Sequence, residues 1–253
     1  MYSSFYWFSV DKGTKNTEHF LYSRKTDLYM DLLQRNHQLL LKGINCTFLR
    51  YLHARIEWED RLIGIFGSRG VGKTTLLLQH IKLKFEDSRE ALYVNLDDFW
   101  FETHSLTDAV KEFLQAGGHY LFLDEIHFYS SWMEEVSTLL DANPALKIVF
   151  ATTSLYSQTE VRNGLRHEAA FYTMHPMSFR EFLSYESILD KDPIPLEDIL
   201  ANHHDLVKEI NAEMNIVPIY RNYLEHGCYP FYWQDPDMYY FCLLYTSPSP
   251  RDS

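Results

Sequence analysis

The chain has 253 residues, of which 46% are hydrophobic, and its formal net charge is -12. This length allows one large domain, or one domain with a small appendage, and the apolar content allows a sizeable core. The negative charge argues against a broadly basic surface for nucleic acid, although a local basic patch is compatible with it. No apolar run is long enough to span a bilayer, and the N-terminus lacks the basic region and cleavage site of a secretory signal.

Three widely spaced cysteines, Cys46, Cys228 and Cys242, match no metal-binding spacing. Cysteines of this kind are typical of reduced thiols, so we expect a cytoplasmic protein without membrane attachment. The aromatic fraction of 16% favours packing over a platform for stacking bases.

The N-terminal residues 1–26 show no clear hydrophobic period. Leucines at helical spacing follow between Leu28 and Leu40, and Gly43 is suited to end a helix, so we predict a helix over this stretch. Residues 48–56 predict a second short helix before the first strand.

Short apolar runs then alternate with helical patterns. The predicted strands are 62–66, 91–95, 120–123, 147–151 and a shorter fifth at 171–174. The helices that follow the second, third and fifth strands carry capping patterns at Ser105 with Asp108, Ser131 with Glu134, and Ser178 with Glu181. This alternation predicts an α/β fold with a parallel five-stranded sheet flanked by helices, followed by a partial helical segment beyond residue 195.

Between the first strand and its helix, residues 67–74 read Gly-Ser-Arg-Gly-Val-Gly-Lys-Thr, which fits the phosphate-binding loop G-x-x-x-x-G-K-[ST]. Glycines let successive backbone N–H groups turn toward phosphate oxygens, and the helix N-terminus adds partial positive charge. Lys73 would reach the outer phosphates and the Thr74 hydroxyl would hold Mg²⁺. The predicted nucleotide-binding residues are Gly67, Ser68, Arg69, Gly70, Val71, Gly72, Lys73, Thr74 and Thr75. A chance glycine-rich turn is the disfavoured alternative.

The third strand ends in Asp124-Glu125, at the sheet edge where ligands of open α/β folds bind. Asp124 would position Mg²⁺, and Glu125 would polarise the water that attacks the γ-phosphate. An ordinary acidic strand end is the alternative, which the phosphate loop disfavours. A whole strand lies between the loop strand and the Asp-Glu strand, which is the layout of the ATPase branch of P-loop proteins. The sequence contains no guanine-reading N-K-x-D motif, which disfavours a GTPase, so ATP is the expected nucleotide. It also contains no L-S-G-G-Q, which disfavours an ABC transporter subunit.

Polar residues follow the fourth strand, at Thr152, Thr153 and Ser154. Strand adjacency would bring a hydroxyl here near the γ-phosphate, and Thr153 is the preferred sensor. A polar strand-to-loop transition is the alternative.

Several other polar residues have two open interpretations. Arg162 and Arg166 follow in what we expect to be a polar loop. Each could contact a phosphate, in cis or across a subunit contact, but a solvated charge is favoured for each singly. Asp97-Asp98 could support Mg²⁺ indirectly or begin a helix. His127 either acts near the reacting groups or packs in the core. For His203-His204, a solvated helix face is a better interpretation than a metal site. Residues 229–233 predict a packed interdomain segment.

With these residues identified, a family resemblance emerges. Residues 61–79, 120–127 with Trp132, and 146–154 resemble archaeal and bacterial AAA+-type ATPases related to the STAND group. Met177-Ser-Phe-Arg-Glu-Phe-Leu183 and residues 224–230 are similar to later segments of that family. The resemblance runs from about Leu28 to Tyr240, and it implies an ATP-binding core, a helical or winged-helix segment and often a nuclease-like domain. The family often has Thr-Gly-Ser-Ser where this chain has Ala-Thr-Thr-Ser, and its arginines before the fifth strand do not align cleanly here.

The resemblance also suggests boundaries. We expect an N-terminal extension at 1–29, with Met30 as a candidate native start, an ATPase core at 30–190 and an incomplete helical segment at 191–240. Residues 241–253 form a sharp compositional break that resembles a translated sequencing adaptor, so we predict an unstructured tail.

The combined interpretation is an ATP-binding protein of the AAA+/STAND type that hydrolyses ATP with Mg²⁺ to drive or reset a conformational change. Lys73, Glu125 and Thr153 would act in catalysis, and Thr74 and Asp124 would hold the metal. The first alternative is a slow or non-catalytic ATP-dependent switch for a protein partner, and a weaker one is a nucleic-acid-handling ATPase. The sequence leaves the partner and a homo-oligomeric state open.

Overall fold

The computed structural model describes residues 14–85, 89–153, 157–189, 191, 193–237 and 239, with only the backbone of residues 14–28 and 234. Ser154, Cys242, the first 13 residues and the tail at 241–253 lie outside the described residues, together with the predictions made for them.

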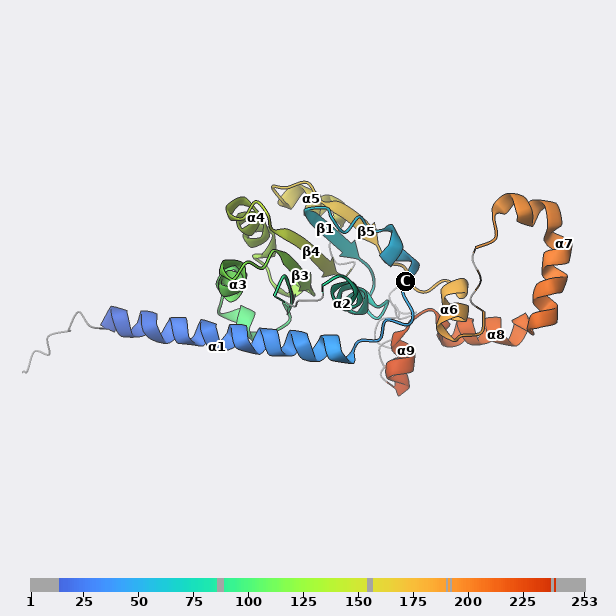
Figure 1. Cartoon of the computed structure of the whole chain (residues 1–253), viewed down its shortest axis with the longest axis horizontal. Helices are drawn as coiled ribbons and strands as arrows, with labels where there is room; N and C mark the ends of the chain where they lie inside the picture. Colours follow the sequence, from blue (N-terminus) through green and yellow to red (C-terminus); the bar gives the residue numbers. More distant parts are fainter. Residues whose placement is uncertain are drawn as a thin grey trace, which may run out of the picture.

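The centre of the molecule is a parallel sheet of five strands in the order β2-β3-β4-β1-β5 (Figure 1). The strands are β1 (Leu62–Phe66), β2 (Ala91–Asn95), β3 (Tyr120–Asp124), β4 (Lys147–Thr152) and β5 (Ala170–Thr173). The predicted fold class is therefore confirmed. Because β4 lies between β1 and β3, the residues that follow it lie between the phosphate loop and the Asp-Glu pair.

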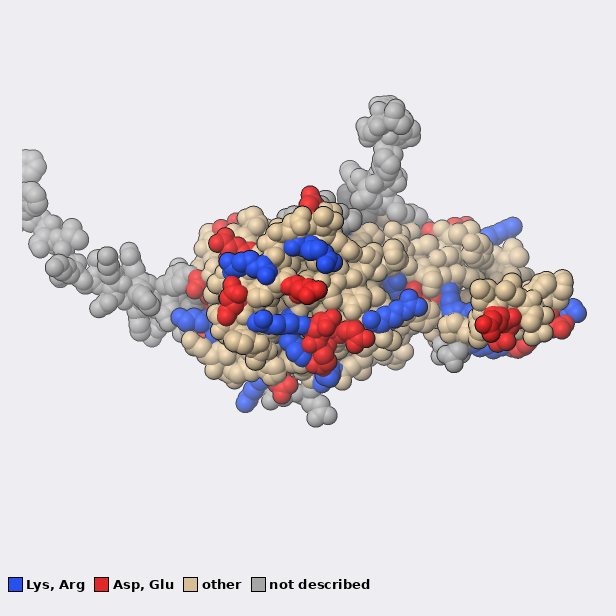
Figure 2. Space-filling model, turned by 90° about the horizontal axis from the view of Figure 1, so that it is seen from above, with Lys and Arg blue, Asp and Glu red and all other residues tan. Residues whose placement is uncertain are grey.

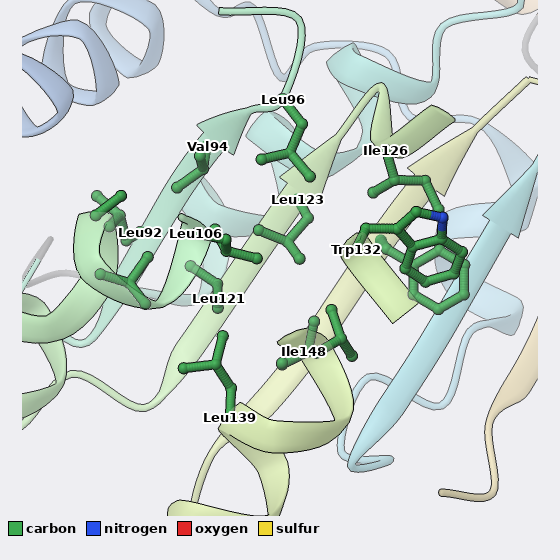
Figure 3. Close-up of a cluster of buried hydrophobic side chains, with 14 of the residues drawn as sticks. Leu92, Val94, Leu96, Leu106, Leu121, Leu123, Ile126, Trp132, Leu139 and Ile148 are labelled. Atoms are coloured by element: carbon green, nitrogen blue, oxygen red, sulfur yellow. The ribbon is translucent and has the colours of Figure 1, made fainter. Parts of the chain in front are cut away.

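Both faces of the sheet are covered by helices. Successive side chains of each strand point to opposite faces, so a strand of apolar residues needs cover on both sides. Leu121 and Leu123 belong to the core beneath α3 (Leu106–Gln115) and α4 (Trp132–Ala142), which Figure 3 shows around Trp132. Phe122 belongs to the other core, beneath α2 (Lys73–Lys84). Burial on both faces explains why the strands read as continuous apolar runs.

The helix α1 (Thr14–Gly43) is longer than predicted, since it begins well before Leu28. Residues 14–27 contain no glycine or proline, so nothing in them prevents a helical backbone even though no apolar period marks it. The helix runs along the edge of the sheet formed by β2 (Figure 1), where the Nδ1 atom of the buried His37 accepts a hydrogen bond from the Tyr93 N–H at 3.1 Å. An edge-strand donor is thereby satisfied.

The predicted caps have mixed outcomes. The Ser105 side chain accepts from the Asp108 N–H, and Ser178 with Glu181 forms a full capping box at α6 (Phe179–Tyr185). The Ser131 cap is wrong, because Ser131 precedes α4 with φ -87° and ψ 5° and makes no side-chain cap. That backbone is not the extended conformation from which a capping side chain reaches the helix.

Two further differences lie in short elements. The predicted helix at 48–56 is a 3₁₀ helix over Tyr51–Arg55. The segment that holds Arg162 is not a loop but α5 (Gln158–Gly164). With seven residues and Val161 as its buried side chain, α5 has too little apolar pattern to be predicted, and a capping box of Ser157 and Glu160 begins it.

Beyond the sheet, the chain forms α7 (Leu196–Glu213), α8 (Ile216–Asn222), a π turn (Tyr223–Gly227) and α9 (Phe231–Gln234). Figure 1 shows α7 projecting away from the sheet, while α9 lies beside the core. Within the described part of the chain, none of the helices has the length and apolar character needed to cross a bilayer.

Candidate nucleotide site

The loop between β1 and α2 has the backbone of a phosphate cradle. Gly70 and Gly72 adopt positive φ angles of 82° and 98°, and Gly72 caps α2. Side chains disfavour this left-handed region, so glycine suits both positions. The Lys73 Nζ atom donates to the carbonyl oxygens of Gly67 and Ser68 at 2.9 Å and 3.0 Å. The ammonium group therefore lies over the loop from which it would reach a phosphate.

The two predicted metal ligands are in direct contact. The Thr74 hydroxyl donates to the Asp124 Oδ2 atom at 2.5 Å, although 50 residues separate them in the chain. Asp124 is only 1% exposed, so this carboxylate would be costly to bury without hydrogen bonds or a cation. Mg²⁺ prefers oxygen ligands, commonly one or two carboxylates with substrate phosphates. The residues present therefore fit the ion that the loop motif implies.

Tyr93 on β2 also belongs to this site, and the sequence analysis did not find it. Its hydroxyl donates to the same Asp124 oxygen at 2.9 Å. Burial raises the pKa of Tyr93, and the nearby charge of Asp124 raises it further, so the hydroxyl stays protonated and can donate. The available signal was a tyrosine in a buried strand, because a buried phenol requires a hydrogen-bond partner.

Glu125 follows Asp124 with a left-handed backbone, at φ 52° and ψ 40°. Such a conformation is uncommon outside glycine, and its strain is characteristic of functional sites. The Glu125 N–H donates to Asp124 Oδ1 at 2.9 Å, while its buried Oε2 atom makes no hydrogen bond within the described structure. Burial raises the pKa of Glu125, and repulsion by Asp124 adds to this, against the attraction of Lys73. A raised pKa suits a general base.

His127 lies close to this carboxylate, with 3.3 Å between His127 Nδ1 and Glu125 Oε2. Burial lowers the pKa of His127, and the positive charge of Lys73 lowers it further. The imidazole is therefore neutral at neutral pH, and the contact is not a charged pair. Of the two interpretations left open, proximity to the chemistry is the one that the geometry favours.

Thr152 ends β4 beside the loop, and Thr153 follows it. The Thr152 carbonyl accepts from the Gly67 N–H at 3.2 Å, and both threonine hydroxyls are buried without a hydrogen-bond partner in the described structure. Buried polar atoms are nearly always paired in proteins, so unpaired oxygens at one sheet edge fit a site built for a polar ligand. The sensor role of Thr153 stays a prediction that this position is compatible with.

The two candidate arginines make their contacts elsewhere. The Arg162 guanidinium lies 5.0 Å from the centre of the Phe171 ring, and the exposed Arg166 pairs with Asp141 at 2.9 Å. Asp98 accepts from the Trp100 N–H at the start of a 3₁₀ helix (Phe99–Glu102), which supports the interpretation that it begins a helix. His203 and His204 are exposed on α7.

A cavity of 260 Å³ adjoins the loop where α2 begins. It lies between the segment before β1, the loop and the C-terminal helical region, and it is lined by Gly43, Ile44, Asn45, Thr47, Phe48, Arg50, Val71, Gly72, Thr75, Gln79, Tyr185 and Pro230. These residues come from four distant parts of the chain, so no local pattern could reveal them. A larger cavity of 530 Å³ lies between α1 and the end of β2 and reaches Thr74.

The sheet order, the loop and the acidic pair define a P-loop domain with an ATPase-type strand arrangement. Residues 59–183 match the family model described as an AAA domain. No curated protein matches the chain.

In two of the similar solved structures, the match spans only about half of the other protein's length. PCH-2 from C. elegans has 14% identity and a TM-score of 0.35, over 68% of this chain and 51% of that one. AMPPCP-bound DnaA from Aquifex aeolicus has 18% identity and a TM-score of 0.37, over 59% of this chain and 53% of the DnaA chain. RIF2 from Saccharomyces cerevisiae has 10% identity and a TM-score of 0.43, over 81% of this chain and 85% of the RIF2 chain. These scores carry no argument, so the description of this domain depends on its own strand order, loop and acidic pair.

Proposed function

We propose that this protein binds ATP with Mg²⁺ at the loop and hydrolyses it slowly, as an AAA+ ATPase related to the STAND group. The observation that carries the proposal is the contact between Thr74 and Asp124 beside Glu125, a carboxylate whose buried Oε2 atom makes no hydrogen bond within the described residues. The loop supplies N–H donors for the phosphates, and the acidic pair supplies a metal ligand and a base. A strand end that served the fold alone would not require a glutamate in a left-handed backbone conformation.

Each residue has a separate role in this proposal. Lys73 binds the outer phosphates, and Thr74 and Asp124 hold Mg²⁺, which when bound neutralises negative charge on the phosphates. Glu125 accepts the proton of the attacking water, and Thr153 contacts the γ-phosphate. Tyr93 orients the Asp124 carboxylate through its hydroxyl.

A regulatory switch for a protein partner is a second candidate, because the loop contacts the C-terminal helices. A side-chain carbon placed on Gly70 would lie 3.5 Å from the Phe231 Cβ atom on α9. Nucleotide binding could therefore change how this segment packs. Nucleic-acid handling is less favoured, since the face in Figure 2 intersperses basic with acidic side chains and the net charge is -12.

Phosphate release by wild type and Glu125→Gln tests the proposal. We expect Glu125→Gln to bind ATP but to lower kcat by about 100-fold or more, as removal of a general base does. Lys73→Ala should lose ATP binding, whereas Glu168→Gln, which removes an exposed carboxylate, should resemble wild type. If wild type and Glu125→Gln bind ATP equally and neither hydrolyses it, the switch is favoured. If wild type binds no ATP, both candidates are wrong.

A further inference from the structure

A buried ion pair joins the phosphate loop to the helical region. Arg50 and Glu181 are 8% and 5% exposed, and the Arg50 Nε atom donates to Glu181 Oε1 at 2.8 Å. The two residues are 131 positions apart in the chain. Burying two charges is expensive, so a pair of this kind requires several compensating hydrogen bonds.

The guanidinium group provides them by contacting two further segments. Its Nη1 atom donates to the Val71 carbonyl at 2.7 Å, and its Nη2 atom donates to the His175 carbonyl at 2.7 Å. Arg50 thus connects the phosphate loop, the segment after β5 and α6. Only the planar fork of arginine presents donors in these directions together.

The contact with Val71 fixes the direction of the next peptide group. A trans peptide is planar, with its C=O and N–H on opposite sides. Holding the Val71 carbonyl toward Arg50 therefore turns the Gly72 N–H to the opposite side of the loop. Gly72 belongs to the phosphate-binding motif, in which backbone N–H groups of this kind cradle the phosphates.

Glu181 is held equally firmly on its side. Its Oε1 atom accepts from the Tyr51 N–H at 3.0 Å, and its Oε2 atom accepts from the Ser178 N–H at 2.9 Å. Burial acts to raise the pKa of Glu181, but its bonds with Arg50 and Ser178 hold the pKa below the ordinary value. The carboxylate is therefore charged, and one residue both caps α6 and anchors Arg50.

We propose that Arg50 and Glu181 are positioning residues for nucleotide binding, which orient the Gly72 peptide of the phosphate loop and couple nucleotide affinity to α6. The inference rests on the proposed ATP site and deepens it. Because coupling between two sites is reciprocal, nucleotide binding must also stabilise α6.

ADP affinity, measured by calorimetry, tests the first half of the proposal. Arg50→Lys keeps the charge but cannot reach all three partners, and we expect it to weaken ADP binding about tenfold, as loss of a charge-assisted hydrogen bond does. Glu181→Gln should act in the same direction. The matched control is Arg61→Lys, which changes an arginine before β1, at the end of that strand opposite the phosphate loop, where its guanidinium donates to the Leu140 carbonyl at 2.6 Å. This control should leave ADP affinity within about twofold of wild type.

Hydrogen exchange of residues 179–185 tests the second half. ADP should slow exchange in α6 of wild type and should slow it less in Arg50→Lys, a difference that a merely structural role would not produce. This measurement on wild type needs no variant to fold.

Three outcomes would overturn the inference. Both pair variants could bind ADP with wild-type affinity, Arg61→Lys could weaken binding as much as they do, or ADP could leave α6 exchange in wild type unchanged. In each of these cases the proposed ATP site stands, because wild type still binds nucleotide. If wild type binds no ADP, the proposed function is wrong and the inference with it.

Discussion

The sheet and the helix α7 differ in how much of their surface is buried. The five residues of β1 are all buried, whereas the 18 residues of α7 include none that is buried. Leu196 and Leu200 on α7 are 68% and 72% exposed. The sheet is stabilised by burial of apolar surface, while α7 depends on local signals such as acidic residues in its first turn.

The candidate site belongs to the buried sheet and not to the exposed helix α7. Asp124 and the loop lysine extend from strand and helix ends whose backbones are fixed by packing on both sides. A site on such elements holds its geometry better than a site on an exposed helix. Two helices that follow the sheet in the chain, α6 and α9, lie close to the phosphate loop. The loop therefore lies between the sheet and these C-terminal helices.

The largest expected effect of a substitution lies in the sheet region. Trp132 is fully buried, and its ring lies 5.0 Å from that of Phe150. Trp132→Ala should destabilise the protein by about 3–5 kcal/mol, because it removes a large side chain and leaves a cavity. Urea unfolding measures this loss. A loss below about 1 kcal/mol would contradict the description of this core as tightly packed.

The sequence predicted the strands because their physical cause is local. Burial on both faces produces an uninterrupted apolar run, and the shift of β5 from the predicted 171–174 to Ala170–Thr173 is small. The same holds for the loop, whose motif requires neighbouring residues. Thr74 and Asp124 were each predicted as Mg²⁺ ligands, from the loop motif and from the acidic strand end, and a hydrogen bond joins their side chains.

What the sequence could not predict depends on contacts between distant residues. Arg50 and Glu181 are ordinary charged residues until the fold brings them together across 131 positions. The same is true of Tyr93, since its role is decided by the register that pairs β2 with β3. Glu181 was predicted only as a helix cap, which describes one of its two carboxylate oxygens.

The next largest effect should come from acidification. Burial lowers the pKa of His37 from 6.5 to about 4, so the folded protein resists a proton that the unfolded chain accepts. Stability is then complete above pH 6.5 and falls as the pH drops toward 4, by about 3 kcal/mol at most from this residue. His80, with a pKa lowered to about 3, acts in the same direction.

His37→Gln separates this effect from general acid unfolding, because a glutamine oxygen can accept from the Tyr93 N–H and takes up no proton. We expect thermal unfolding of this variant to depend less on pH between 6.5 and 5 than that of wild type. His203→Gln, at an exposed position, is the control and should follow wild type. Parallel curves for His37→Gln and wild type would show that the buried imidazole is not a source of acid sensitivity.

The smallest effect should come from α7, where the same substitution can be compared directly across the two regions. Leu139→Ala removes a 2% exposed side chain from the core and should cost about 2–5 kcal/mol, whereas Leu200→Ala removes a 72% exposed one and should change stability by less than about 0.5 kcal/mol. Both variants lose the same atoms, so the difference measures burial alone. Equal losses would mean that the apolar side of α7 is covered in solution. Repeating the unfolding at two protein concentrations would then show whether a second copy covers it, because stability gained from association rises with concentration.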